Sequence, residues 1–200
     1  MSGGPQRLVL ATANPDKVAE IAAILGPDWE LVSRPAGIPD VVEDGDTLEA
    51  NARLKATAVA EATSMAAIAD DTGLEVDALG GAPGVHSSRY AGPDGDAGRN
   101  VAKLLAELEG TAPAERTARF RTVALARFPD GREVIAHGTV EGVITDDVAG
   151  HGGFGYDPVF VPTGPGTDGR TFAEMTAADK HAVSHRGRAF RALAERLTGA

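Results

Sequence analysis

Apolar residues recur along this chain with two different periods, so both strands and helices are expected. Short apolar runs bounded by polar, Gly or Pro residues predict buried strands at residues 8–11, 29–33, 65–69 and 158–161. Two longer strand-like runs, 117–128 and 132–144, are joined by Pro129-Asp130-Gly131, which is a strong hairpin signal. Apolar residues spaced by three and four positions predict helices at 15–25, 46–63, 99–108 and 187–198.

Capping residues mark the starts of two of these helices. Pro15 suits a first helical position, and Asn14 before it is a natural N-cap. Asp46 is predicted to cap the second helix, with Glu49 three residues later in capping-box spacing. Hairpin and crossover connections both occur, so the sheet should be mixed. The chain is therefore predicted to be α/β, with residues 1–200 as one domain.

Two adjacent carboxylates, Asp70 and Asp71, follow the predicted strand 65–69 and precede Gly73 in a predicted turn. Like charges a few ångströms apart raise each other's pKa, so bringing them together is costly. A divalent cation relieves that cost, and hard oxygen ligands of this kind suit Mg²⁺. A solvated acidic turn is the alternative interpretation, and the neighbouring motifs favour the metal site.

The junction between the first strand and the first helix carries Thr12, Asn14 and Lys17. A helix N-terminus offers unpaired N–H groups and the positive end of a dipole, so it is a ready site for phosphate oxygens. A hydroxyl, an amide and a lysine there would complete a phosphate cradle. Helix capping with a surface lysine is the alternative.

Two further segments carry polar groups suited to a nucleotide. Glu43 lies in an acidic loop, and the helix after it places Asn51 and Lys55 on one face, which turns either to a ligand or to solvent. A glycine-rich segment allows close backbone approach, and its aromatic rings can stack on a base; it contains Phe154, Gly155, Tyr156 and Asp157. Donors for anionic or carbonyl oxygens follow at Lys180, His185 and Arg186.

Composition excludes several classes of protein. The net charge of −10 argues against a general polynucleotide binder, which needs a surplus of Lys and Arg. Cysteine is absent, so thiol catalysis, disulfides and thiolate metal sites are excluded. The first apolar run is too short for a signal peptide or a membrane span. A cytoplasmic enzyme that does not bind membranes is therefore expected.

In content and order, these segments resemble the inosine triphosphatase family, the dITP/XTP pyrophosphatases of nucleotide-pool sanitation. The resemblance covers nearly the whole chain and depends on Thr12–Lys17, Glu43 with Asn51 and Lys55, Ala69–Asp77, Gly80–Gly84, Phe154–Pro158, and Lys180 with Ser184–Gly187. It implies an elongated mixed β-sheet flanked by helices, two lobes with an active-site cleft between them, and a homodimer. It also implies Mg²⁺-dependent hydrolysis of dITP, ITP and XTP to the monophosphate and pyrophosphate, which keeps these bases out of DNA and RNA.

The resemblance also assigns roles by position. Asp71 matches the general base and a metal ligand, and Glu43 and Asp70 match the other acidic residues of the metal site. The substrate-binding positions are Thr12, Asn14, Lys17, Asn51, Lys55, Thr72, Phe154, Gly155, Tyr156, Asp157, Lys180, His185 and Arg186. In this mechanism a water held by Mg²⁺ attacks the α-phosphorus, and Asp71 accepts its proton.

Two other interpretations stay open. The Maf-like pyrophosphatases share the fold and hydrolyse other nucleotides, but the segments Phe154–Asp157 and His185-Arg186 weigh against them. A nucleotide-binding sensor without catalysis is the second. The acidic set Glu43, Asp70 and Asp71 weighs against a sensor, because binding alone requires no general base.

Overall fold

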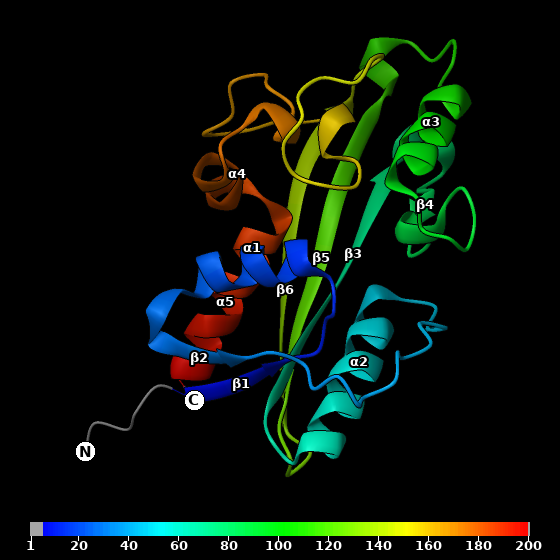
Figure 1. Ribbon diagram of the computed structural model, residues 1–200. Helices are drawn as coiled ribbons and strands as arrows, with labels where there is room; N and C mark the ends of the chain where they lie inside the picture. The colour runs from blue at the N-terminus through cyan, green and yellow to red at the C-terminus, as the bar shows by residue number, and fades with distance from the viewer. Residues whose placement is uncertain (1–5, 200) are drawn as a thin grey trace. The chain divides into compact units, whose positions relative to one another are not determined.

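A computed structural model describes residues 6–199, so residues 1–5 and 200 of the expected domain lie outside the described residues. Within this range seven strands form one sheet, in the order β2-β1-β3-β5-β6-β7 with β4 paired to β3 (Figure 1). The strands are β1 Gln6–Leu10, β2 Trp29–Val32, β3 Ala67–Val76, β4 Pro83–Gly84, β5 Thr117–Arg127, β6 Glu133–Ile144 and β7 Phe160–Pro162. The helices are α1 Pro15–Leu25, α2 Leu48–Thr63, α3 Ala97–Glu107, α4 Ala177–Val183 and α5 His185–Thr198.

The sheet is mixed, as the sequence predicts. Strand β1 pairs in parallel with both β2 and β3, and these strands are connected through helices, which parallel pairing requires. The pairs β3–β4 and β6–β7 are antiparallel. The α/β prediction is therefore confirmed.

The chain divides into two compact units. Unit 1 comprises the described residues up to Asp71, together with Thr122–Gly138 and the residues from Arg186 on. Unit 2 comprises Thr72–Arg121 and Thr139–His185. The division falls inside β3, β5 and β6, so these strands contribute residues to both units.

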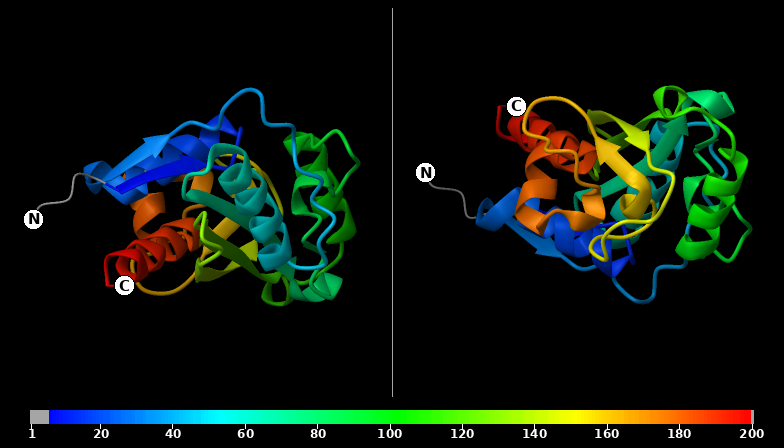
Figure 2. Two further views of the ribbon diagram at one scale, coloured as in Figure 1. Left: turned by 90° about the horizontal axis from the view of Figure 1, so that it is seen from below. Right: turned by 90° about the horizontal axis from the view of Figure 1, so that it is seen from above.

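In unit 1, helices pack on both faces of the strands. On one face Leu8 and Ile68 belong to a buried cluster with residues of α1 and α5. On the other face Val9 and Ala67 belong to a second cluster, which includes residues of α2 (Figures 1 and 2). Successive side chains of a strand point to opposite faces, so each strand supplies both clusters by alternation.

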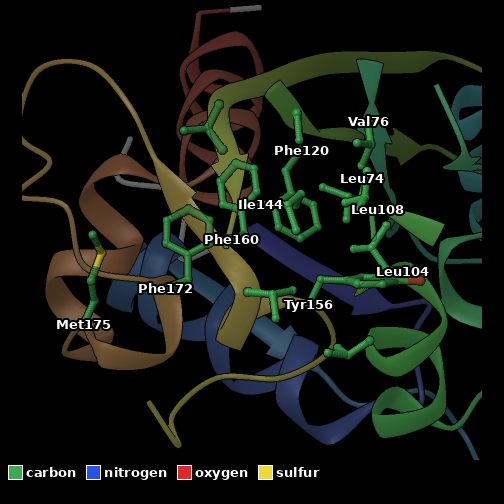
Figure 3. Close-up of a cluster of buried hydrophobic side chains, with 14 residues drawn as sticks. Leu74, Val76, Leu104, Leu108, Phe120, Ile144, Tyr156, Phe160, Phe172 and Met175 are labelled. Atoms are coloured by element: carbon green, nitrogen blue, oxygen red, sulfur yellow. The ribbon is translucent and has the colours of Figure 1, made fainter. Parts of the chain in front are cut away.

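Unit 2 has a core rich in aromatic rings (Figure 3). The ring of Phe160 lies with its centroid 4.7 Å from that of Phe120 and 5.2 Å from that of Phe172. Leu104 of α3 and Leu108 just after it are fully buried in the same cluster. Tyr156, one of the predicted base-binding residues, belongs to this core.

Two local predictions from the sequence are wrong, and one helix was not predicted. The N-cap of α2 is Thr47, whose side chain accepts the N–H of Ala50, so the helix begins one residue later than a cap at Asp46 implies. Strand β3 does not turn at Gly73 but runs on to Val76. Helix α4 was not predicted, although Thr176, which caps it, lies three residues before Asp179 in the usual capping spacing.

Among residues 6–199, none of the helices combines the length and the apolar character needed to cross a membrane.

Candidate active site

Strand β3 separates the two adjacent carboxylates instead of bringing them together. Because side chains alternate along a strand, Asp70 points to the same face as Ile68, and Asp71 to the same face as Ala69. Asp70 therefore meets residues of α1 and α5, whereas Asp71 meets residues of α2. The prediction that the two carboxylates form a close like-charge pair is wrong for this geometric reason.

Asp70 is fully buried and lies in an ionic cluster with Arg186, which is also buried, and with the partly buried Lys17 and Glu20. Its Oδ2 lies 3.2 Å from Nζ of Lys17 and accepts hydrogen bonds from Nη2 and Nε of Arg186 at 3.1 and 3.3 Å. Arg186 also donates through Nη1 to Glu20 at 2.5 Å. Burial would raise the pKa of Asp70, but Lys17, Arg186 and Lys55 outweigh it and hold this pKa well below its usual range. Asp70 is therefore an ionised carboxylate at neutral pH.

Asp71 has a different environment on the opposite face. Its Oδ1 accepts a hydrogen bond from Nζ of Lys55 at 3.0 Å, and its Oδ2 accepts one from Nδ2 of Asn51 at 3.2 Å. Burial raises the pKa of Asp71, and the nearby Glu43 adds to this while Lys55 opposes it. A raised pKa makes a carboxylate a stronger base, which is the property that proton abstraction requires.

The donor set around Lys55 suits a small divalent cation. Nζ of Lys55 lies 3.2 Å from Oε2 of Glu43 and 3.0 Å from Oδ1 of Asp71, so two carboxylates from distant parts of the chain converge on one positive charge. Hard carboxylate oxygens are the ligands that Mg²⁺ prefers. Within residues 6–199 no three His, Asp or Glu side chains are gathered closely enough to hold a metal by themselves. Water and substrate phosphates would supply the remaining ligands, as is usual for Mg²⁺.

The predicted phosphate cradle begins helix α1 as expected. Oδ1 of Asn14 accepts the N–H groups of Asp16 and Lys17 at 2.9 and 3.2 Å, and Oγ1 of Thr12 accepts the N–H of Asn14 at 3.1 Å. The N-cap prediction for Asn14 is confirmed. Asn14 is exposed, so the positive end of α1 is open to solvent. The ammonium group of Lys17 is held at this end by Asp70.

In unit 2 the central feature is an ion pair between Asp157 and Lys180, both nearly fully buried. Nζ of Lys180 donates to Oδ2 of Asp157 at 2.6 Å, and the N–H of Phe154 donates to the same oxygen at 2.8 Å. Nζ of Lys180 also lies 5.0 Å from the ring centroid of Phe154, within cation–π range. Gly153 has φ +66°, and a Cβ there would fall on the carboxylate of Asp157, so glycine is required.

The neighbouring predicted residues of unit 2 differ in exposure. The ring of Tyr156 is part of the aromatic core, and its hydroxyl donates to the carbonyl of Ser87 at 2.9 Å (Figure 3). His185 is also buried, with its ring stacked on Phe120 at a centroid distance of 4.4 Å. Gly155 (φ +65°) and Thr72 are half-buried. Tyr156 and His185 therefore contribute to the packing of unit 2, and their contacts with substrate stay a prediction.

Sequence reasoning missed two residues of the site in unit 1. Glu20 accepts a hydrogen bond from Arg186. Glu20 lies three residues after Lys17, so the two side chains share one face of the helix, and this spacing could have pointed to Glu20. Gly45 donates its N–H to Oδ1 of Asn51 at 2.9 Å. No local pattern pointed to Gly45, because this contact depends on the path of the loop before α2.

Comparison with known proteins decides the family. The model of the Ham1 family matches residues 8–196. The chain belongs to the Ham1 family. Its relatives include a protein of Streptomyces coelicolor named "dITP/XTP pyrophosphatase", which is 49% identical over 192 residues, 94% of each chain. The resemblance predicted from the sequence is thereby confirmed.

Solved structures of the Ham1 family agree with this fold. A HAM1 protein from Coxiella burnetii matches with a TM-score of 0.86 and 38% identity, covering 98% of this chain and 100% of that one. A nucleoside-triphosphatase / dITP/XTP pyrophosphatase from Mycobacterium abscessus matches with a TM-score of 0.74 and 43% identity, covering 94% and 98%. The mixed sheet flanked by helices is therefore the family's architecture.

Proposed function

We propose that this Ham1-family protein is a Mg²⁺-dependent dITP/XTP pyrophosphatase that hydrolyses dITP, ITP and XTP to the monophosphate and pyrophosphate. The observation that carries the proposal is the convergence of Asp71 and Glu43 on Lys55. Burial lowers the pKa of Lys17 in the first turn of α1, and the charge of Lys55 is close enough to lower it further. Relatives that are 45% and 49% identical to this chain are named "dITP/XTP pyrophosphatase". Removal of deaminated purine nucleotides would keep these bases out of DNA and RNA.

The triphosphate would bind through unit 1. Its tail carries about four negative charges, which cations must neutralise before a nucleophile can approach. The positive end of α1, with Thr12 and Asn14, and the ammonium groups of Lys17 and Lys55 offer that neutralisation. Glu43 and Asp71 would hold Mg²⁺, which when bound supplies charge neutralisation and a more acidic water. Asp70, the third predicted ligand, keeps that role only as a prediction, since its carboxylate faces Lys17 and Arg186.

Asp71 would act as the general base. Its Oδ atoms accept hydrogen bonds from Lys55 and Asn51, which orient the carboxylate, and burial raises its pKa, which makes it a stronger base. As Asp71 accepts the proton of the attacking water, the water oxygen bonds to the α-phosphorus. The bond from that phosphorus to the bridging oxygen breaks, and pyrophosphate leaves with the bond's electron pair.

The nucleobase of the substrate would be recognised by the remaining predicted residues, chiefly those of unit 2. The chain itself links them to the phosphate-binding set, because Thr72 follows Asp71 and Arg186 follows His185. The candidates are Thr72, Phe154, Gly155, Tyr156, Asp157, Lys180, His185 and Arg186. A site that pairs with the 6-keto oxygen leaves its own groups unpaired against adenine, which costs binding and gives discrimination.

The direct test is pyrophosphate release from dITP, XTP, dGTP, dATP and dTTP, each with and without Mg²⁺. We expect strong, Mg²⁺-dependent release from dITP and XTP. Their bases, hypoxanthine and xanthine, carry the 6-keto group that adenine lacks, and neither has the 2-amino group of guanine. Preference for dTTP or a standard purine would instead support a Maf-like activity. Binding of dITP without release would support a sensor.

Replacing Lys17 with alanine should mainly raise KM for dITP, by about tenfold, since loss of one charged contact to phosphate costs about 1.4 kcal/mol or more. Initial rates over a range of dITP concentrations at saturating Mg²⁺ would measure it. Arg7→Ala is the control, because that basic side chain is 58% exposed and pairs with Glu30. An unchanged KM with full activity would place the phosphate site elsewhere.

We also propose that residues 1–200 work as one two-lobed domain in a cytoplasmic homodimer, as the family resemblance implies. The molecular mass in solution, measured by light scattering after size exclusion, should be twice that of the 20.5 kDa chain. A single-chain mass at micromolar concentration would contradict the dimer.

A further inference from the structure

The loop before helix α2 carries Glu43, and every residue from 33 to 47 is exposed or only half-buried. Its first part is tied by Arg34, which donates to the carbonyls of Ile38 and Pro39 at 2.7 and 2.6 Å. Beyond that, Val42 is 75% exposed, so hydrophobic burial does not anchor this stretch. The position of Glu43 must therefore depend on polar contacts near the end of the loop.

Asn51 supplies such a contact and joins it to Asp71. Its side chain is fully buried, so it presents no surface to a substrate. Its Oδ1 accepts the N–H of Gly45 at 2.9 Å, and its Nδ2 donates to Oδ2 of Asp71 at 3.2 Å. One amide group thus binds the Glu43 loop with one end and the proposed catalytic carboxylate with the other.

Gly45 makes this connection sterically possible. A Cβ added at residue 45 would lie 2.7 Å from Cβ of Ala50 and 2.7 Å from Oδ1 of Asn51, closer than real Cβ contacts. Cβ of Ala50 and the backbone N of Asn51, which would lie 3.2 Å from the added Cβ, are fixed in the first turn of α2 and cannot move without disturbing the helix. Any side chain at residue 45 would therefore push the loop, and Glu43 with it, away from Asn51.

We propose that Asn51 is a positioning residue that holds Glu43 and Asp71 together around Lys55, and that Gly45 is required because only glycine lets the loop reach Asn51. This inference rests on the proposed function. It differs from the role that the family resemblance implies for Asn51, which is binding the substrate. Groups behind metal-ligating residues commonly orient them in this way.

The chain offers a matched pair of variants for the test. Gly45→Ala introduces the clash, whereas Gly37→Ala adds the same methyl group earlier in the same loop, where a Cβ meets no heavy atom of the described chain within 4 Å. For Gly45→Ala we expect the Mg²⁺ concentration for half-maximal pyrophosphate release to rise about tenfold, as for other losses of ligand-orienting contacts. KM for dITP at saturating Mg²⁺ should change less than twofold, because the phosphate-binding residues are untouched. Gly37→Ala should match the wild type in both quantities.

A measurement without turnover complements these rates. Thermal unfolding with Mg²⁺ alone should show a rise in Tm for the wild type and Gly37→Ala, and a clearly smaller rise for Gly45→Ala. Asn51→Leu removes both contacts and should give the same loss together with a lower kcat. If Asn51→Leu does not fold, the Gly45→Ala result decides the question.

The outcomes separate this inference from the proposed function. If Gly45→Ala lowers Tm but leaves both Mg²⁺ responses as in the wild type, the contact is only structural and the inference is overturned. A wild type whose Tm does not respond to Mg²⁺ overturns it as well. If the wild type hydrolyses none of the nucleotides, the proposed function fails, while the Mg²⁺ unfolding data still test the positioning by Asn51.

Discussion

Replacing Asp71 with asparagine should lower kcat for dITP by about 10³-fold, within the range that general acid–base catalysis contributes. Asparagine keeps the shape of the side chain and can still accept a hydrogen bond from Lys55, but it cannot take a proton from water. KM should change little, since the phosphate contacts proposed for Lys17 and helix α1 would be intact. Initial rates of pyrophosphate release at saturating dITP and Mg²⁺ would measure the effect.

Two controls show whether this result reports the loss of the general base. Asp28→Asn makes the same chemical change at an exposed position and should leave kcat unchanged. Thermal unfolding of Asp71→Asn should show a folded protein, and calorimetric titration with dITP should show binding close to that of the wild type. A kcat near the wild-type value would remove Asp71 as the general base.

Replacing Asp70 with asparagine should lower the free energy of unfolding by about 3–5 kcal/mol, the usual cost of leaving buried charges without their partner. The side chain of Asp70 is 0% exposed, and that of Arg186 is 2% exposed. Without the carboxylate, the positive charges of Lys17 and Arg186 lose a shared buried partner, while the ion pair between Arg186 and Glu20 is retained. The retained Glu20 places the expected loss toward the lower end of the range.

Urea unfolding of the wild type and of Asp70→Asn would measure this loss. Glu30→Gln is the control, because Glu30 and its partner Arg7 are about half exposed, and surface pairs contribute at most about 1 kcal/mol. Equal losses of unfolding free energy in the two variants would show that the buried cluster stabilises the protein no more than an exposed ion pair does.

The difference in unfolding free energy between the wild type and Asp70→Asn should depend on pH, because Asp70 titrates in the wild type. The folded-state pKa of Asp70 lies below the unfolded value of about 3.9, so its contribution is present above that pH and is lost as the pH falls through the folded value. The difference in stability between wild type and Asp70→Asn should therefore be constant near neutral pH. It should shrink in acid, when the carboxyl of the wild type takes up its proton.

Local sequence chemistry determined much of this protein. Asn14 caps α1 because a side-chain oxygen before a helix finds free N–H groups within two or three residues, whatever the rest of the chain does. The strand-like runs 117–128 and 132–144 with the hairpin signal between them likewise predicted the long strands, and the observed β5 and β6 begin and end within one residue of the expected limits. The segments around Asp70-Asp71, Phe154–Asp157 and Arg186 were together specific enough to identify the family.

Contacts between distant residues were decided only by the tertiary structure. The sequence places Asp70 and Asp71 side by side, but their opposite directions follow from the continuation of β3 through them, which the apparent turn at Gly73 concealed. Their partners lie 16 to 116 residues away, as Lys55 and Arg186 do, and no local period reports such distances. For the same reason the sequence did not reveal that the buried amide of Asn51 joins Gly45 to Asp71. Local sequence patterns therefore determine hydrogen bonds between near neighbours, such as helix caps. The packing of distant segments determines which charged side chains form ion pairs.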